Sequence, residues 1–144
     1  MKKMPFHPYL FIFRKSSEES SLVLWDGKKR YTKKIKETPG VRKNVLKEID
    51  SFLCTRKVLP ALLLGVVVYS GPGQFSFLRT SISIANTFGY ALKIPVIGVE
   101  ESEYTNGKDF FIVGLEKIQK IKEFFPVAPA YGKDPNITRS RATL

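Results

Sequence analysis

The 144-residue sequence lacks the residues that thiol, metal and histidine chemistry need. It has one cysteine, Cys54, and one histidine, His7. A single cysteine cannot close an intrachain disulfide, so we expect a reducing compartment and place the chain in the cytoplasm. His7 stands between Phe6 and Pro8 near the amino terminus, which is a poor position for a Ser-His-Asp or Cys-His pair. The sequence therefore predicts no metal site and no catalytic residue.

Long hydrophobic runs are also missing. The longest run, from Val58 to Tyr69, is interrupted by Pro60 and Gly65, and it is shorter than the about 20 residues that a membrane-spanning helix needs. Met1-Lys2-Lys3 resembles the start of a signal peptide, but prolines and charged residues break up the segment that follows. We therefore expect no membrane association.

Acidic residues are scarce beside basic ones, with 13 Asp and Glu against 24 Lys and Arg and a net charge of +11. Residues 1–60 hold fifteen basic and six acidic side chains, whereas residues 61–144 hold nine and seven. Such an excess suits a nucleic acid or another acidic partner. The first half carries no RNA-recognition, zinc-finger or helix-turn-helix signature, which favours a solvated surface without excluding a nucleic-acid site.

Apolar periodicity predicts a meander of strands followed by alternating helices and strands. Asp26-Gly27 is typical of a two-residue hairpin turn, and Thr38-Pro39 is typical of a helix start. The expected elements are strands at 9–13, 21–25 and 30–32, a helix at 41–53, a strand at 62–70, a helix at 76–93, strands at 95–99 and 110–113, and a helix at 115–125. After these, the chain reads as an extended tail. This order predicts an α/β fold.

A glycine-rich turn joins the predicted buried strand 62–70 to the helix 76–93. Gly71-Pro72-Gly73 would let another group approach the backbone closely and would leave the helix N-terminus open, as at an anion site. The turn lacks both the Lys-Ser/Thr ending of a P-loop and the third glycine of a dinucleotide fingerprint. A tight turn without a ligand is therefore the simpler interpretation.

The helix predicted at 76–93 is apolar nearly all round. Its apolar residues fall on two faces, with Leu78, Ile82 and Ala85 on one and Phe77, Ile84, Phe88 and Ala91 on the other. Ser81, Ala85 and Gly89 add a stripe of small side chains, which could pack on the helix's own sheet or let another backbone approach. Because a helix that covers one side of a sheet normally has a polar outer face, we predict that one apolar face binds a partner helix.

The segment from Val66 to Arg79, VVVYSGPGQFSFLR, closely resembles the Gly-Pro-Gly-Ser-Phe-Thr-Gly-Leu-Arg signature of the bacterial TsaB (YeaZ) family. The resemblance continues to residues 94–99 and returns, in shorter form, at 128–132 and 135–138. TsaB proteins are the non-catalytic partners of the TsaD enzyme in the synthesis of tRNA threonylcarbamoyladenosine. The resemblance implies an actin-like ATPase (ribonuclease H-like) fold.

The resemblance also implies how the chain assembles. Helices 41–53 and 76–93 would form a helical bundle with a TsaD-like protein, with a TsaE-like ATPase as a further partner, tRNA reached through the complex, and a homodimer when the chain is isolated. No cofactor is expected on the chain alone, and ATP or ADP would bind only at an interface shared with these partners. The signature loop that would contact nucleotide there comprises Gly71, Pro72, Gly73, Phe75 and Arg79. The residues expected at the partner interface are Val45, Ile49, Phe52, Leu78, Ser81, Ile82, Ala85, Asn86 and Gly89.

Three departures from the family pattern bear on these expectations. The first strand of the family ends in Asp-Thr-Ser, whereas residues 13–17 here read Phe-Arg-Lys-Ser-Ser, and Phe77 stands where the signature has its last glycine. Most of the family's second domain is also expected to be absent, which divides the chain into an amino-terminal lobe, 1–100, and a remnant, 101–144. Without the aspartate, we do not expect Mg-dependent ATP hydrolysis by this chain.

Three functions are therefore considered. The leading hypothesis is a minimal TsaB-like scaffold, not itself an enzyme, that activates or stabilises TsaD. The alternative is a basic nucleic-acid-binding module, with tRNA as the ligand and no enzymatic activity. An independent hydrolase ranks third, because the chain has no credible nucleophile–base pair and its acidic pair near a strand end, Glu100-Glu101, is typical of a solvated loop.

Overall fold

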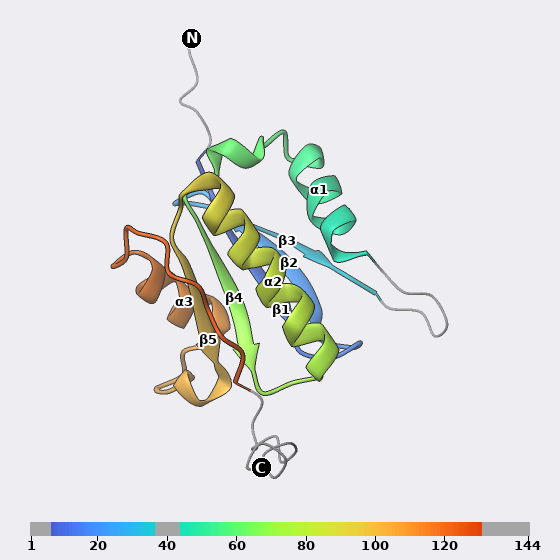
Figure 1. Ribbon diagram of the computed structural model, residues 1–144, viewed down its shortest axis with the longest axis vertical. Coiled ribbons are helices and arrows are strands. Elements are labelled where there is room, and N and C mark those ends of the chain that lie inside the picture. Colours follow the sequence, from blue (N-terminus) through green and yellow to red (C-terminus); the bar gives the residue numbers. More distant parts are fainter. Residues whose placement is uncertain (1–6, 37–43, 131–144) are drawn as a thin grey trace, which may run out of the picture.

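A five-stranded sheet with the strand order β3-β2-β1-β4-β5 lies at the centre of the computed structural model (Figure 1). The structure describes residues 7–36 and 44–130. The strands are β1 (Tyr9–Arg14), β2 (Ser20–Trp25), β3 (Arg30–Lys34), β4 (Gly65–Gly71) and β5 (Val96–Glu100). The helices are α1 (Val45–Thr55), α2 (Phe75–Leu92) and α3 (Phe110–Ile118), with short 3-10 turns η1 (Pro60–Leu62) and η2 (Glu101–Glu103).

The first three strands form the predicted antiparallel meander. Its second turn is fixed by Asp26, whose Oδ1 accepts hydrogen bonds from the backbone N–H groups of Lys28 and Lys29 at 2.8 and 2.7 Å. Gly27 takes a φ of +100° in that turn, a conformation that costs glycine little. β4 then joins β1, and β5 joins β4, both in parallel. This order confirms the predicted α/β fold.

Helices cover both faces of the sheet. Gly89 of α2 packs against Val96 of β5, whose partner on β4 is Val66. Gly114 of α3 packs against Val67, the next residue along β4. Because successive side chains of a strand point to opposite faces, α2 and α3 lie on opposite sides of the sheet. In Figure 1, α1 runs beside α2, and α1 and α2 contact each other.

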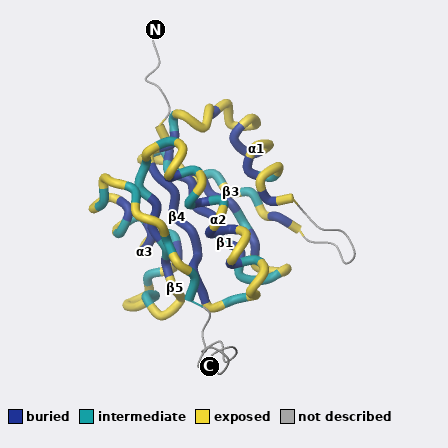
Figure 2. Tube along the Cα trace, viewed as in Figure 1, coloured by how far each residue is buried: buried dark blue, intermediate teal, exposed yellow. Residues whose placement is uncertain are grey.

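The core lies between these layers, and the middle of the sheet is buried on both faces. All seven residues of β4 are buried, and the central strands are dark blue in Figure 2. On the α3 side, the ring of Phe11 lies 4.7 Å from that of Phe111 and 6.0 Å from that of Phe110. A strand buried on both faces has a continuous apolar sequence, which explains why β4 could be predicted from the sequence.

The predicted strand at 110–113 is wrong, because these residues begin α3. Asp109 caps the helix, and its Oδ1 accepts a hydrogen bond from the backbone N–H of Ile112 at 3.0 Å. Phe110, Val113 and Gly114 are buried, which is the spacing of one helix face. The helix predicted at 115–125 therefore overlaps only the end of α3, which stops at Ile118.

The other boundaries shift by a few residues. In the described part of the chain, the first helix begins after Asn44, whose side chain accepts a hydrogen bond from the N–H of Lys47 at 3.1 Å. The start predicted at Thr38-Pro39 lies outside the described residues, as do the family-like stretches at 131–132 and 135–138.

The segment predicted as a second-domain remnant packs on the sheet as far as it is described. Phe110, Val113 and Ile118 of α3 belong to the same hydrophobic core as the strands. The division of the chain at residue 100 stays a prediction. None of the helices in the described residues combines the length and the apolar character that crossing a bilayer requires.

Candidate partner surface and signature loop

The loop after β4 is held to its surroundings by backbone hydrogen bonds. Tyr69 donates its hydroxyl hydrogen to the carbonyl oxygen of Pro72 at 2.6 Å, and the Gly71–Pro72 peptide is cis. The N–H of Gln74, which precedes α2, donates to the carbonyl of Lys15 at 2.9 Å. Since these bonds join the end of β1, the end of β4 and the start of α2, the loop is a fixed junction at the carboxyl ends of these parallel strands, which we call the carboxyl edge of the sheet.

The two glycines of the loop are explained by close approach of this chain's own backbone. Gly71 has a φ of +131°, and a Cβ there would overlap the carbonyl of Ala130. A Cβ on Gly73 would lie 2.9 Å from the carbonyl oxygen of Lys15. The sequence had left open what approaches the glycines, and in the described residues it is residues 15 and 130 of the same chain.

Arg14 and Phe77, two of the departures from the family pattern, are in contact. Arg14 ends β1 and is 3% exposed, and its guanidinium carbon lies 4.1 Å from the centroid of the Phe77 ring. The Nε of Arg14 also donates to Ser20 Oγ at 3.1 Å. A guanidinium over an aromatic face is favourable and stronger when desolvated. The basic residue therefore occupies the strand end where the family pattern has its aspartate.

Next to Arg14, the same edge carries an ion pair. The Nζ of Lys15 lies 3.0 Å from Oε2 of Glu101. Burial, followed by the charges of Glu101 and Glu19, raises the pKa of Tyr69 to about 12, and burial likewise raises the pKa of Tyr104. These phenols stay protonated at neutral pH, so they can donate hydrogen bonds there but cannot act as bases.

The edge contains no recognisable metal site. Within residues 7–36 and 44–130, no group of three or more His, Cys, Asp or Glu side chains could hold a metal ion. Glu101 forms an ion pair with Lys15. The neighbouring Glu100 takes part in a capping box with Glu103 around η2. This pair therefore has a structural use in the described residues. The signature-loop residues Phe75 and Arg79 lie in the first turns of α2 and contact each other, with the guanidinium carbon of Arg79 5.2 Å from the centroid of the Phe75 ring.

The residues expected at the partner interface lie mostly inside the chain. Eight of the nine are buried and the ninth, Asn86, is half-buried; the buried ones are Val45, Ile49, Phe52, Leu78, Ser81, Ile82, Ala85 and Gly89. Their burial corrects the prediction, because a side chain packed in its own core is not available to a partner. The face of α2 that was assigned to a partner is the face that covers the sheet.

The small-residue stripe of α2 receives a segment of the same chain. We call residues 124–130 the strap. Asn86 accepts a hydrogen bond from the Val127 N–H at 2.9 Å and donates one to the Val127 carbonyl at 3.0 Å. A Cβ on Gly89 would overlap Val96 and crowd the Phe124 ring. The N–H of Ala130 donates to the carbonyl of Ser70 at 2.7 Å. Within the stripe, Gly89 therefore meets side chains of β5 and of the strap, and the backbone of the strap is bound by Asn86 beside the stripe.

The exposed apolar surface lies between α1 and the outer side of α2. Leu46 is 53% exposed, and with the half-buried Phe88 it borders a groove of about 430 Å³ whose lining includes Ile49 and Leu53. A smaller hollow of about 210 Å³ continues over Ile84 and Phe88. We call this area, formed by Leu46, Ile84 and Phe88, the apolar groove.

The sequence contained a signal for this groove. Ile84 and Phe88 fall on the second apolar face of the predicted helix, whereas the small residues Ala85 and Gly89 fall on the side that covers the sheet. Small residues allow a helix to approach a sheet closely, which indicates that the face with Ile84 and Phe88 lies outside. Leu46 is adjacent to the predicted stripe of α1 and was left out of the interface.

Comparison with known proteins gives the architecture a counterpart. "YeaZ from Pseudomonas aeruginosa" superimposes with a TM-score of 0.58 and 20% sequence identity, over 68% of this chain and 45% of that chain. A second structure, of "an uncharacterized protein with similarity to peptidase YEAZ from Pseudomonas aeruginosa", gives a TM-score of 0.53 and 22% identity, over 68% of this chain and 44% of that chain. The fold is that of the YeaZ structures.

The match to the YeaZ fold is partial in length, because this chain spans less than half of either solved structure. The expected actin-like, ribonuclease H-like fold is confirmed. A family model described as "TsaD: tRNA N6-adenosine threonylcarbamoyltransferase" matches residues 40–110, a stretch that includes α1, β4, α2 and β5. A search of curated proteins found no match.

Proposed function

We propose that this chain is a non-catalytic, TsaB-like partner of a TsaD-type enzyme in the formation of threonylcarbamoyladenosine in tRNA. The observation that carries the proposal is the apolar groove on α1 and α2. Its residues, the exposed Leu46 and the half-buried Ile84 and Phe88, form a partly exposed apolar surface on two neighbouring helices. Contiguous exposed apolar surface marks interaction sites in soluble proteins, and two helices with such a surface suit a helical bundle.

The likeness of fold and the family match support the choice of partner. The two similar structures carry the name YeaZ, and the matching family model is that of a threonylcarbamoyltransferase. The matched stretch includes both helices that form the groove. The partner would therefore be a TsaD-type enzyme, with a TsaE-like ATPase as a further component.

The chemistry at the carboxyl edge of the sheet supports a role without catalysis. Arg14 and Lys15 stand at the end of β1, where an aspartate would be needed to hold a magnesium–nucleotide complex. The Arg14 guanidinium is already stacked on Phe77, and Lys15 is paired with Glu101. A magnesium ion would meet two cations here. ATP or ADP would therefore bind only with groups from a partner, next to the signature loop.

The test is capture of the TsaD-type enzyme encoded in the same genome. Tagged full-length chain, co-expressed with that enzyme, is purified and run on size-exclusion chromatography, and the modification of tRNA is assayed with and without the chain. Leu46→Arg and Ile84→Arg place a cation in the groove without burying it in the core, so both variants should fold and lose the partner. Arginine at Ala85 or Ile82 would instead unfold the chain, because both residues are buried.

Ile112→Arg is the matched control. Ile112 is 41% exposed on α3, on the opposite side of the sheet from the groove. Its replacement by arginine makes the same change of size and charge as Ile84→Arg. Capture should survive this substitution. If Leu46→Arg and Ile84→Arg fold and still capture the enzyme as well as Ile112→Arg does, the groove is not the interface. Self-association of the isolated chain, expected through the same surface, is measured on the same column.

A further inference from the structure

A row of cations follows the free edge strand of the sheet. β3 ends the sheet next to β2, and it contributes Arg30, Lys33 and Lys34. The preceding turn contributes Lys28 and Lys29, and Arg56 follows α1. We call these six residues, Lys28, Lys29, Arg30, Lys33, Lys34 and Arg56, the basic edge.

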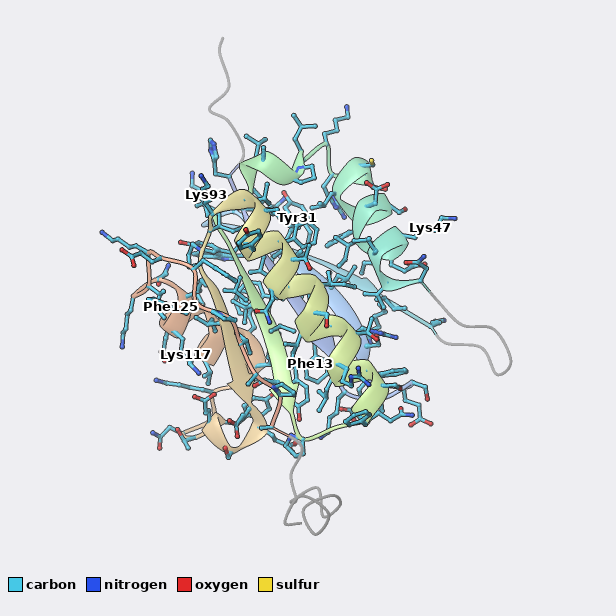
Figure 3. All side chains as sticks on the ribbon, in the orientation of Figure 1. Phe13, Tyr31, Lys47, Lys93, Lys117 and Phe125 are labelled. Atoms are coloured by element: carbon cyan, nitrogen blue, oxygen red, sulfur yellow. The ribbon has the colours of Figure 1, made fainter. Side chains whose placement is uncertain are left out.

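Aromatic rings, rather than carboxylates, hold the two arginines of the basic edge. The guanidinium carbon of Arg56 lies 4.4 Å from the centroid of the Tyr31 ring, and that of Arg30 lies 4.2 Å from the Phe111 ring. Tyr31 projects from β3 and lies between α2 and α1 in Figure 3. A cation–π contact orders a guanidinium while leaving its charge and its N–H donors available. The arginines are thus positioned but not neutralised.

Few acidic groups oppose these cations in the described part of the chain. Glu48 of α1 lies 3.2 Å from the Nζ of Lys33. Asp26 accepts the backbone N–H groups of Lys28 and Lys29, so its carboxylate shapes the turn and leaves both lysine side chains exposed. Six of the fifteen basic residues of the first half of the sequence therefore lie along one edge of the fold.

We propose that the basic edge binds the phosphate backbone of an RNA. Arg30 and Lys34 lie four residues apart on β3, or about 13 Å at strand spacing. A nucleic-acid duplex carries one charge per about 1.7 Å of its axis, so several phosphates lie within the length that these cations cover. A line of separated cations matches such a line of phosphates better than it matches a single bound anion. Guanidinium forks add bidentate contacts to phosphate oxygens.

The choice of RNA rests on the proposed function, in which tRNA is the substrate, while the charge argument is independent of it. The groove and the basic edge are made of different residues. The chain could therefore bind a TsaD-type enzyme without binding RNA, or bind RNA without that enzyme, and the two proposals can fail separately.

The experiment measures the affinity of the full chain for a fluorescent, unmodified tRNA transcript at several KCl concentrations. Lys29→Gln combined with Lys34→Gln removes two cations of the basic edge. The control, Lys120→Gln combined with Lys122→Gln, removes two exposed cations beyond α3. Each lost phosphate contact reduces the magnitude of the slope of log affinity against log salt by about 1. The first pair should therefore reduce that magnitude by about 2, and the control pair should leave it unchanged.

Four results would overturn the proposal. The wild-type chain could fail to bind tRNA, or the control pair could change the slope as much as the Lys29 and Lys34 pair does. A DNA duplex of equal charge could bind as tightly as the tRNA, which would refute the choice of RNA. Tighter binding to a polyglutamate peptide or to phosphatidylserine vesicles would assign the edge to another class of partner.

Two arms separate the outcomes of the two proposals. Leu46→Arg should lose the TsaD-type enzyme and keep the tRNA affinity and its salt slope. The Lys29 and Lys34 pair should keep capture of the enzyme while its tRNA affinity falls. If Leu46→Arg also lowers the salt slope by about 2, the basic edge is not the RNA site.

Discussion

Asn86 should hold the strap against α2, and its removal should destabilise the chain by a predictable amount. Its side chain makes two hydrogen bonds with the backbone of Val127, of 2.9 and 3.0 Å. At about 0.5–1.5 kcal/mol net for each bond, the loss in Asn86→Ala is about 1–3 kcal/mol. Alanine returns about 0.7 kcal/mol of helix propensity, which leaves a net loss of about 0.3–2.3 kcal/mol.

The assay is urea unfolding combined with thermal unfolding of the full chain. For a chain of this size, 1 kcal/mol corresponds to about 4 °C in Tm, so we expect a fall of about 1–9 °C. Hydrogen exchange gives a local readout, because the Val127 amide is protected by Asn86 Oδ1. The Val127 amide should exchange faster in the variant than in the wild type. The amides of β4, which is buried throughout, serve as the reference whose exchange should change less.

Thr87→Ala is the matched control, one residue away on the same helix. Thr87 is exposed, and its hydroxyl donates only to the carbonyl of Ser83 one turn earlier. The same gain in helix propensity applies, so Thr87→Ala should be neutral or slightly stabilising. Equal unfolding free energies for the Asn86 and Thr87 variants, with unchanged exchange at Val127, would refute the assignment of Asn86 to the strap.

Two further predictions concern the carboxyl edge of the sheet. A double-mutant cycle of Arg14→Ala and Phe77→Ala should give a coupling energy of about 0.5–2 kcal/mol in urea unfolding, because the guanidinium stacks on the ring; additive effects would contradict the contact. The pKa of Tyr69 is about 12 in the folded chain, against 10.0 for an unperturbed tyrosine, so the unfolded state loses its proton first as the pH rises. The free energy of unfolding should therefore fall between about pH 10 and pH 12, and the part due to Tyr69 should disappear in Tyr69→Phe; a wild type and variant with the same pH dependence would show that the hydroxyl is not perturbed.

Most of the fold could be predicted because its signals are local and periodic. β4 is a continuous apolar run. Asp26-Gly27 lies in a hairpin turn as expected, but the central residues of the turn are Gly27 and Lys28, because the Asp26 N–H donates to the Lys29 carbonyl. Residues 110–113 misled the prediction, since two aromatic and two β-branched residues in a row are typical of a strand. The side chain of Asp109 decides the outcome by capping a helix at this point, and burial against Phe11 and Val67 then stabilises it.

The candidate surface was harder to predict, because the sequence of an apolar helix does not determine which part of the fold each of its faces contacts. The interface prediction depends on the small-residue stripe, but in the fold Gly89 of the stripe meets the side chains of Val96 and Phe124, and the strap backbone is bound by the neighbouring Asn86. A contact between residues 86 and 127 depends on where the chain returns after α3, and no periodicity within α2 encodes that return. The small side chains of Ala85 and Gly89, compared with Phe88, indicate only which face of α2 approaches the sheet closely.

Arg14 and Phe77 show why departures from a family pattern should be considered in pairs. Taken separately, the loss of an aspartate removes a ligand for magnesium, and a phenyl ring in place of glycine crowds the first turn of α2. In the fold the two side chains stack at 4.1 Å, and Ser20 fixes the guanidinium from the other side. The ring and Ser20 thus both contact the buried guanidinium. An aspartate at residue 14 would place a carboxylate against the negative face of the Phe77 ring, so the arginine and the phenylalanine suit each other at this strand end.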